Sequence, residues 1–308
     1  MSAARLLTVR HLTVYRYAEP VRLGEHRMMF RPRESHDLRL LQTRLDILPV
    51  PADLRWLHDV FDNSVAIAVF DAAATLELRF DSTVTLEHLE TTLPDYALEH
   101  EARTYPFNYS AEDDPDLTTA RARHYRGDEV REWAGRFLSP IGSTDTMGLL
   151  QAMTFAIKND FVYVPRSEKG VQPPEKTLRL RSGSCRDFAL FMMEAVRSLG
   201  LAARFVSGYM FVADDDRTAT VGGGATHAWM QVYLPGAGWV DFDPTNSIIG
   251  NRNLIRVAVA WDQGQALPLW GSYIGAASSF VGMDVHVSVS EANRFASAAP
   301  LPASLASS

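Results

Sequence analysis

Residues 182 to 187 of this 308-residue chain are Ser182-Gly183-Ser184-Cys185-Arg186-Asp187, and the apolar run Phe188-Ala189-Leu190-Phe191-Met192-Met193 follows them directly. Cys185 is the only cysteine, so it forms neither an internal disulfide nor a multi-cysteine metal site. The residues before it predict a helix start, where unpaired backbone N–H groups and the helix dipole stabilise a thiolate. This position favours a nucleophile, although free cysteines are about as often small buried residues.

A second segment, residues 226–245, has the alternation of a β-hairpin. One strand places His227 and Trp229 on one face, and its opposite face is apolar: Ala228, Met230, Val232 and Leu234. Pro235-Gly236-Ala237-Gly238 predicts a turn, and the next strand carries Asp241 and Asp243. Paired strands bring such side chains within reach of each other. A catalytic cysteine needs a base and a group that orients the base, and a histidine with an acid supplies both.

Several segments together resemble the bacterial transglutaminase-like superfamily. They are Gly183-x-Cys185-Arg186-Asp187-x-Ala189, Gly200-Leu201-x-Ala203-Arg204-x-Val206-Ser207-Gly208-Tyr209, Thr226-His227-Ala228-Trp229 and Gly238-Trp239-x-x-x-Asp243-Pro244-Thr245-Asn246. Nearer the start, Arg31-Pro32-Arg33 and Asp59-x-Phe61-Asp62-Asn63 resemble the β-rich N-terminal region of that superfamily, with Asp62 where glycine is expected. The resemblance covers roughly residues 5 to 260.

The resemblance implies a papain-like core with a Cys-His-Asp triad, and it assigns the catalytic residues as Cys185, His227 and Asp243. Asp243 is chosen over Asp241 because the triad acid of the superfamily precedes Pro-Thr. Strand periodicity alone does not distinguish the two acids, since it places both on one face. Trp229 and Trp239 are expected to pack around the imidazole. The Cys185 backbone N–H is the expected oxyanion donor, and Tyr163 is a candidate for the second one.

The hydrophobic period predicts an α+β protein with a β-rich first part. Residues 1–92 alternate like strands and predict an antiparallel β-sandwich-like domain. Residues 93–126 are expected to be a connector, with Asp113-Asp114-Pro115-Asp116 as a solvated loop. Residues 127–260 are expected to form the papain/transglutaminase-like core, in which the helix bearing the nucleophile packs on an antiparallel sheet. Residues 261–295 would add C-terminal strands that complete the fold, before a disordered tail, 296–308.

Within the core, two helices precede the nucleophile. One opens at Glu129, and another runs from Thr144 to about Lys158, with Asp145 or Thr144 as its cap. A strand is expected at residues 204–212. Asp214-Asp215-Asp216 and Gly222-Gly223-Gly224 lack companion motifs for a cation or a phosphate, so a loop at the edge of the active site is favoured.

Composition narrows the function classes. A net charge of −7 argues against a nucleic-acid surface, and no apolar stretch approaches the length of a membrane span. The first ten residues lack the apolar centre of a signal peptide, and a free thiol suits a reducing compartment, so a cytoplasmic location is expected. Neither a cofactor nor a metal is expected. The expected partner is a peptide or protein substrate, and self-association through the N-terminal region stays open.

The expected chemistry is cysteine-dependent acyl transfer on an amide through a thioester. Hydrolysis by a protease or amidase is favoured, because water is always present and protein crosslinking in the cytoplasm would be hazardous. One alternative is a true transglutaminase, in which an amine accepts the acyl group. The other is a non-catalytic binding or scaffold module on the same fold.

Overall fold

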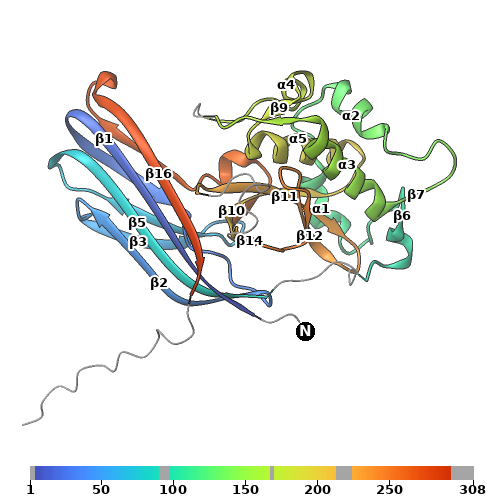
Figure 1. Cartoon of the computed structure of the whole chain (residues 1–308), viewed down its shortest axis with the longest axis horizontal. Coiled ribbons are helices and arrows are strands. Elements are labelled where there is room, and N and C mark those ends of the chain that lie inside the picture. The colour runs from blue at the N-terminus through green and yellow to red at the C-terminus, as the bar shows by residue number, and fades with distance from the viewer. Residues whose placement is uncertain (1–3, 90–96, 167–169, 213–223, 293–308) are drawn as a thin grey trace, which may run out of the picture.

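The computed structural model describes residues 4–89, 97–166, 170–212 and 224–292. Three layers are stacked in it (Figure 1): a large curled sheet, a second sheet, and a layer of helices that holds the nucleophile. The α+β class expected from the sequence is confirmed. Among the described residues, no helix has both the length and the apolar character needed to cross a membrane.

The curled sheet has seven strands, and all of its pairings are antiparallel. Five strands lie in the order β2-β5-β1-β4-β3, and β15 and β16 also pair with β1. The bounds are β1 Arg5–Met28, β2 Leu38–Leu48, β3 Asp53–His58, β4 Ser64–Val69, β5 Ala74–His88, β15 Leu269–Ile274 and β16 Phe280–Glu291. The antiparallel N-terminal domain is therefore one curled sheet, and the C-terminal strands belong to it.

Alternation along the strands explains how this sheet packs. In β5, every second residue from Leu78 to Leu86 is buried, while those between are partly exposed. Val84, Leu86 and the β1 residues Leu7 and Val9 form one apolar cluster with side chains of the second sheet, among them Ile255. The two sheets thus bury a shared core.

The second sheet is antiparallel with the order β13-β12-β11-β10-β14. Its strands are β10 Ala203–Met210, β11 His227–Leu234, β12 Gly238–Asp243, β13 Ile248–Ile249 and β14 Leu254–Ala260. The hairpin of β11 and β12 matches the alternation in the sequence: Ala228, Met230 and Val232 pack with the helices, and Trp229 belongs to a separate cluster.

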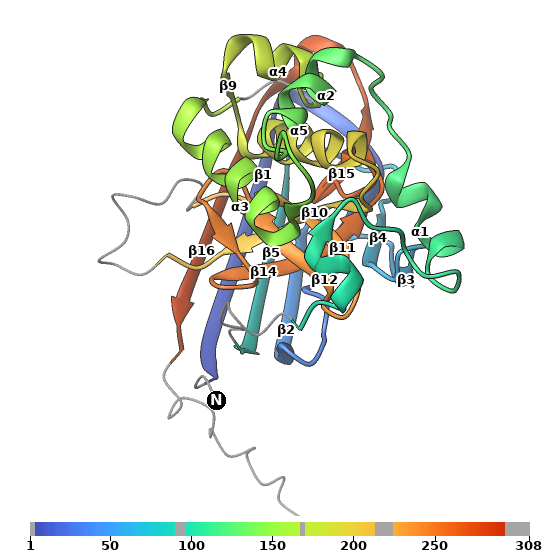
Figure 2. The same ribbon diagram turned by 90° about the vertical axis from the view of Figure 1, so that its right-hand side faces the viewer.

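Helix α5 packs on the other face of this sheet, and three further helices pack around α5 (Figure 2). The four helices are α2 Asp128–Gly135, α3 Thr146–Asp160, α4 Pro174–Leu180 and α5 Cys185–Ser198. Asp145 caps α3 by accepting a hydrogen bond from the Gly148 N–H at 2.6 Å. Nearly every residue of α5 is buried, as expected for a helix that contacts other elements on all sides.

A buried ion pair fixes the far end of α5. Arg197 donates to Glu194 at 2.9 Å and also to the carbonyl oxygens of Ala203 and Trp261. Glu194 in turn accepts from the backbone N–H groups of His124 and Tyr125. These contacts attach the segment before α2 to the helix that carries the nucleophile.

The described part of the segment expected as a connector, residues 97–126, contains regular structure. It holds η1 His100–Arg103, β6 Thr104–Tyr105, which pairs with β7 Thr144–Asp145, and helix α1 Asp114–Arg121. The prediction of a loop at Asp113-Asp114-Pro115-Asp116 was wrong, because this run starts α1. Proline in the first turn and acids near the positive end of the dipole both favour a helix start.

Shorter elements complete the described chain: β8 Val162–Tyr163, β9 Ser182–Gly183, η3 Gln263–Gln265 and η4 Ala277–Ser279. Asp62 has a φ of 61°, in the left-handed region, which explains why glycine was expected there. Asp214-Asp215-Asp216, Gly222, Gly223 and the tail 296–308 lie outside the described residues.

Candidate active site

Cys185 is the first residue of α5, and a carboxylate holds the start of this helix in place. Asp187 accepts from both the backbone N–H and the hydroxyl of Ser184, each at 2.8 Å. As the first helical residue, Cys185 has a backbone N–H with no acceptor inside the helix. The start of α5 therefore combines a thiol, an available donor and a positive dipole end.

Asp187 also ties the preceding loop to the nucleophile. Its other oxygen accepts from the Gln172 backbone N–H and from the Arg166 guanidinium, both at 2.7 Å. A Cβ on Gly183 would lie 2.8 Å from the Cβ of Asp187, so glycine is required for this close approach. Asp187 was not predicted as a site residue, although Ser184-x-x-Asp187 has the spacing of a helix-start capping pair.

His227, the first residue of β11, is joined to Asp243, the last residue of β12. The His227 Nε2 lies 2.8 Å from Asp243 Oδ2. The carboxylate also accepts from the Thr245 backbone N–H at 2.8 Å and from the Asn246 amide at 2.9 Å. Asn246 belongs to the motif that ends the second strand, but no function was predicted for it. An amide three residues after the acid could have suggested this contact. These bonds fix the carboxylate and hence the ring plane.

Burial strengthens the His227–Asp243 interaction. Both side chains are fully removed from water, which disfavours charge on each of them. In His227, this desolvation lowers the pKa, but the Asp243 charge and hydrogen bond, with a further contribution from the Cys185 thiol, raise the pKa to about 10. In Asp243, burial raises the pKa, and the His227 charge and the hydrogen bonds outweigh it, so that the pKa is lowered. Both shifts favour the charged pair, an imidazolium with a carboxylate.

The remaining ring nitrogen of His227 is not used by Asp243. His227 Nδ1 is buried and makes no hydrogen bond within the described part of the chain. The Cys185 thiol is close enough to the ring to contribute to the raised pKa of His227. The ring is therefore bound to the acid through Nε2, and Nδ1 stays available to the neighbouring thiol.

Asp241 has different partners from Asp243, although both come from β12. It accepts from Trp229 Nε1 at 2.6 Å, from the Gln231 amide at 2.8 Å and from Arg256 at 3.1 Å. The structure thus brings Cys185, His227 and Asp243 together and places Asp241 in another network.

The two tryptophans also separate. Trp229 stacks on His227, with ring centroids 5.9 Å apart and an interplanar angle of 26°. Trp239 does not pack around the imidazole as expected; it lies under Arg204, whose guanidinium carbon is 4.1 Å from the ring centroid, and beside Trp261. As a strand neighbour of Tyr233, Trp239 sits at the far end of the hairpin from His227.

Tyr163 lies close to the nucleophile through a short strand pairing. In the parallel pair of β8 and β9, Tyr163 is opposite Gly183, two residues before Cys185. Burial and then the charge of Cys185 raise the pKa of Tyr163 to about 12. The phenol therefore keeps its proton at neutral pH and can donate a hydrogen bond.

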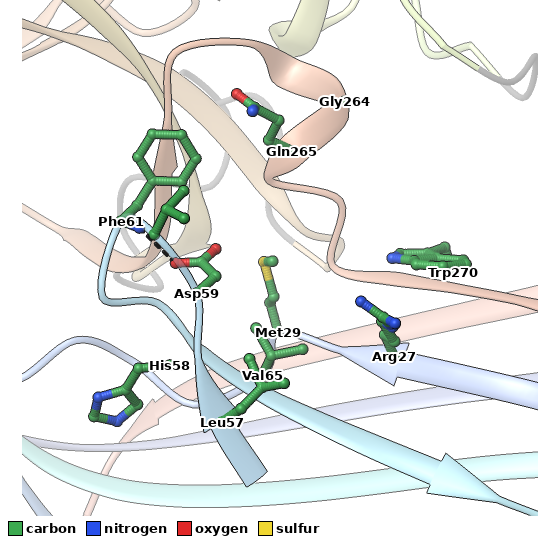
Figure 3. A pocket seen from close by; sticks show the side chains of 11 residues that line it. Arg27, Met29, Leu57, His58, Asp59, Phe61, Val65, Gly264, Gln265 and Trp270 are labelled. Atoms are coloured by element: carbon green, nitrogen blue, oxygen red, sulfur yellow. Dashed lines mark hydrogen bonds between the residues drawn. The ribbon is translucent and has the colours of Figure 1, made fainter.

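Two cavities lie away from these residues, on the N-terminal sheet. One of about 380 Å³ is bounded by β1, β3, β15 and η3, with Met29, Phe61 and Trp270 in its wall (Figure 3). The other, of about 520 Å³, lies between β2 and β3. None of Cys185, His227 and Asp243 lines either cavity. In the described residues, no group of three His, Cys, Asp or Glu side chains could hold a metal ion.

Two family models match separate parts of the chain. The bacterial transglutaminase-like N-terminal region matches residues 7–87, and the transglutaminase-like superfamily core matches residues 137–244. The second range includes Cys185, His227 and Asp243.

Similar proteins match along nearly the whole chain. Uncharacterized proteins of Mycobacterium tuberculosis and Mycobacterium bovis are each 30% identical over 300 residues, covering 93% of this chain and 94% of theirs. A solved structure from Cytophaga hutchinsonii, provisionally described as a cysteine protease, has a TM-score of 0.68 at 19% identity. The match covers 95% of this chain and 93% of that one, and it establishes a shared fold. This chain belongs to the transglutaminase-like superfamily, with a bacterial transglutaminase-like N-terminal region ahead of its core.

Proposed function

We propose that this protein is a cysteine-dependent amidohydrolase or peptidase that cleaves an amide bond through a thioester on Cys185. One observation carries the proposal: His227 Nε2 lies 2.8 Å from Asp243, its buried Nδ1 makes no hydrogen bond within the described residues, and the Cys185 thiol lies close enough to affect the pKa of the ring. This arrangement is the nucleophile–base–acid order that acyl transfer requires.

The first half of the reaction forms the thioester. The Cys185 thiolate attacks the amide carbonyl carbon, a C–S bond forms, and the carbonyl electron pair moves to the oxygen. The backbone N–H of Cys185, together with the Tyr163 hydroxyl, would stabilise that oxyanion. The C–N bond then breaks as the imidazolium of His227 gives its proton to the nitrogen, and the amine leaves.

The second half returns the enzyme to its starting state. Neutral His227 takes a proton from a water molecule, whose oxygen attacks the thioester carbonyl. Collapse of this second intermediate breaks the C–S bond and releases the carboxylic acid and the thiolate. Asp243 holds the ring in one orientation and offsets the charge of the imidazolium in both halves.

Two measurements test the proposal. Intact-mass analysis after brief incubation with glutamine peptides, asparagine peptides and isopeptides should reveal an acyl adduct in the wild type that is absent in Cys185→Ala. Ammonia or amine release should accompany it, and added primary amine should divert only a minor part of the product. Amine incorporation that exceeds hydrolysis would identify a transglutaminase instead. No adduct with any amide would favour the binding-module alternative.

A further inference from the structure

A buried carboxylate beside the triad connects the base to the N-terminal region. Asp241 is 3% exposed, and both of its oxygens have partners. Oδ1 accepts from Trp229 and Gln231, and Oδ2 accepts from Arg256. A buried charge with partners on three sides is costly to leave unpaired, so its neighbours are held in fixed positions.

Trp229 connects Asp241 to the imidazole of His227. Its indole has a single N–H donor, and that donor is bound to Asp241 at 2.6 Å. The ring is completely buried and stacks on His227. The indole lies against Gly208, which is opposite His227 in the sheet: a Cβ there would come within 2.7 Å of the ring, so a larger residue would displace it. The orientation of the indole therefore fixes one face of the base.

Arg256 extends the network into the N-terminal region. Its Nη1 donates to Asp241, and its Nη2 donates to both oxygens of Asp37, at 2.6 and 2.9 Å. Asp37 is the residue directly before β2, and it also accepts from the Asn251 amide at 2.8 Å. A continuous chain of contacts thus runs from the N-terminal sheet to the ring of His227.

Two further arginines lie near this network, so the charges of Asp37 and Asp241 are needed to offset the positive charge. Arg204 donates to Gln231 at 2.7 Å, and its pKa is lowered to about 9 by burial first and then by the charges of Arg33 and Arg256. Arg33 donates to the Phe61 carbonyl at 2.7 Å and to Asn63. With three guanidinium groups gathered here, the loss of either acid would leave positive charges to repel one another close to the base.

We propose that Asp37, Arg256 and Asp241 are positioning residues through which the N-terminal region orients the catalytic base His227, by way of Trp229. None of the three touches the thiol or the reacting atoms. The proposal rests on the function proposed above, because it takes His227 as the base. It gives the N-terminal region a part in the chemistry.

The experiment compares Asp37→Asn, Asp241→Asn and Trp229→Phe with the wild type. The matched control is Asp81→Asn, which removes a carboxylate of the same sheet that pairs with Arg10 and Arg79. The first readout is the pH profile of Cys185 alkylation by iodoacetamide, which needs no substrate. The second is kcat and KM on an amide from the panel above, and circular dichroism confirms folding.

Each of the three variants should slow alkylation at pH 6.5 by about tenfold, equivalent to a shift of one pH unit in the profile. kcat should fall with KM unchanged, while Asp81→Asn should match the wild type in both readouts. The double variant Asp37→Asn/Asp241→Asn should lose less than the product of the single losses, because both act through one chain of contacts.

Two results are separable. Folded variants with the wild-type alkylation profile and kcat, whatever their melting temperatures, would overturn the positioning role, since a merely structural network affects stability alone. If the wild type and His227→Ala gave the same alkylation profile, the proposed function itself would be refuted. Trp229→Phe keeps a ring against His227, so it provides the test if the charge variants do not fold.

Discussion

Asp243 and His227 form a hydrogen bond at 2.8 Å with neither side chain exposed to solvent, although sixteen residues separate them in the chain. The hairpin of β11 and β12 produces this contact, because it brings the first residue of one strand to the end of the next. Since water does not compete for the bond, the carboxylate holds the imidazolium firmly.

Asp243→Asn is therefore expected to be severely impaired. An amide in place of the carboxylate favours the wrong tautomer of the ring, and turnover should fall on the order of 10⁴-fold, as for other triad acids. Asp241→Asn, on the same strand, should lose only about tenfold, because its effect on the base is indirect. Steady-state kinetics on folded variants measures both, and the reverse ranking would show that Asp241 is the triad acid.

The reactivity of Cys185 should depend on His227 at neutral and mildly acidic pH. With its pKa raised to about 10, the imidazole carries a positive charge beside the thiol across this range and stabilises the thiolate. Alkylation at pH 6 should be at least about tenfold faster in the wild type than in His227→Ala. His36→Ala, an exposed histidine before β2, is the control. Identical pH profiles for the wild type and His227→Ala would contradict the ion pair.

Asp187 is expected to contribute strongly to stability. Replacing it by Ala removes an acceptor from Arg166 and from the start of α5, and breaking a buried charge pair costs about 3–5 kcal/mol of unfolding free energy. Urea denaturation measures this. Asp46→Ala, which loses an exposed partner of Arg44, should cost less than about 1 kcal/mol. Equal losses in the two variants would show that the Asp187 contacts add nothing.

His11 should make the protein sensitive to acid. It is buried between the two sheets, where it bonds Tyr209 at 2.9 Å, and burial lowers its pKa to about 4. Between pH 6.5 and 4 the unfolded chain binds this proton and the folded chain does not, so the free energy of unfolding falls as the pH falls. The loss approaches about 3 kcal/mol by pH 4, the equivalent of roughly two pKa units.

A His11→Gln variant tests this expectation. Denaturation curves at several pH values should give a smaller decrease in unfolding free energy between pH 6.5 and 4 than in the wild type. His36→Gln should keep the wild-type slope, because His36 is exposed. An unchanged slope in His11→Gln would assign the acid sensitivity to other groups.

Local patterns made the hairpin and the helix start predictable. The alternation of the sequence placed Trp229 and Ala228 on different faces of one strand, and the residues around Cys185 marked the start of α5. Both features depend on neighbours within a few residues. The choice of Asp243 over Asp241 came from the family resemblance, since strand periodicity gives both acids the same face.

Contacts between distant segments were not predictable in the same way. Asp37 and Arg256 are 219 residues apart, and nothing near either one indicates the other. The pairing of β16 with β1 likewise joins segments that are far apart in the sequence. Helix α1 was missed for another reason: with eight residues, it is too short to show a clear period among its charged side chains.

Strand β1 pairs along residues 7–16 with β5 on one side and with β16 on the other. During synthesis, β5 leaves the ribosome soon after β1, whereas β16 follows only after the whole catalytic core has been made. Until then, one edge of β1 has unpaired backbone groups, which can join strands of other chains. Any chain that stops before residue 280 keeps that edge open, so premature termination yields an aggregation-prone product even when the triad is complete.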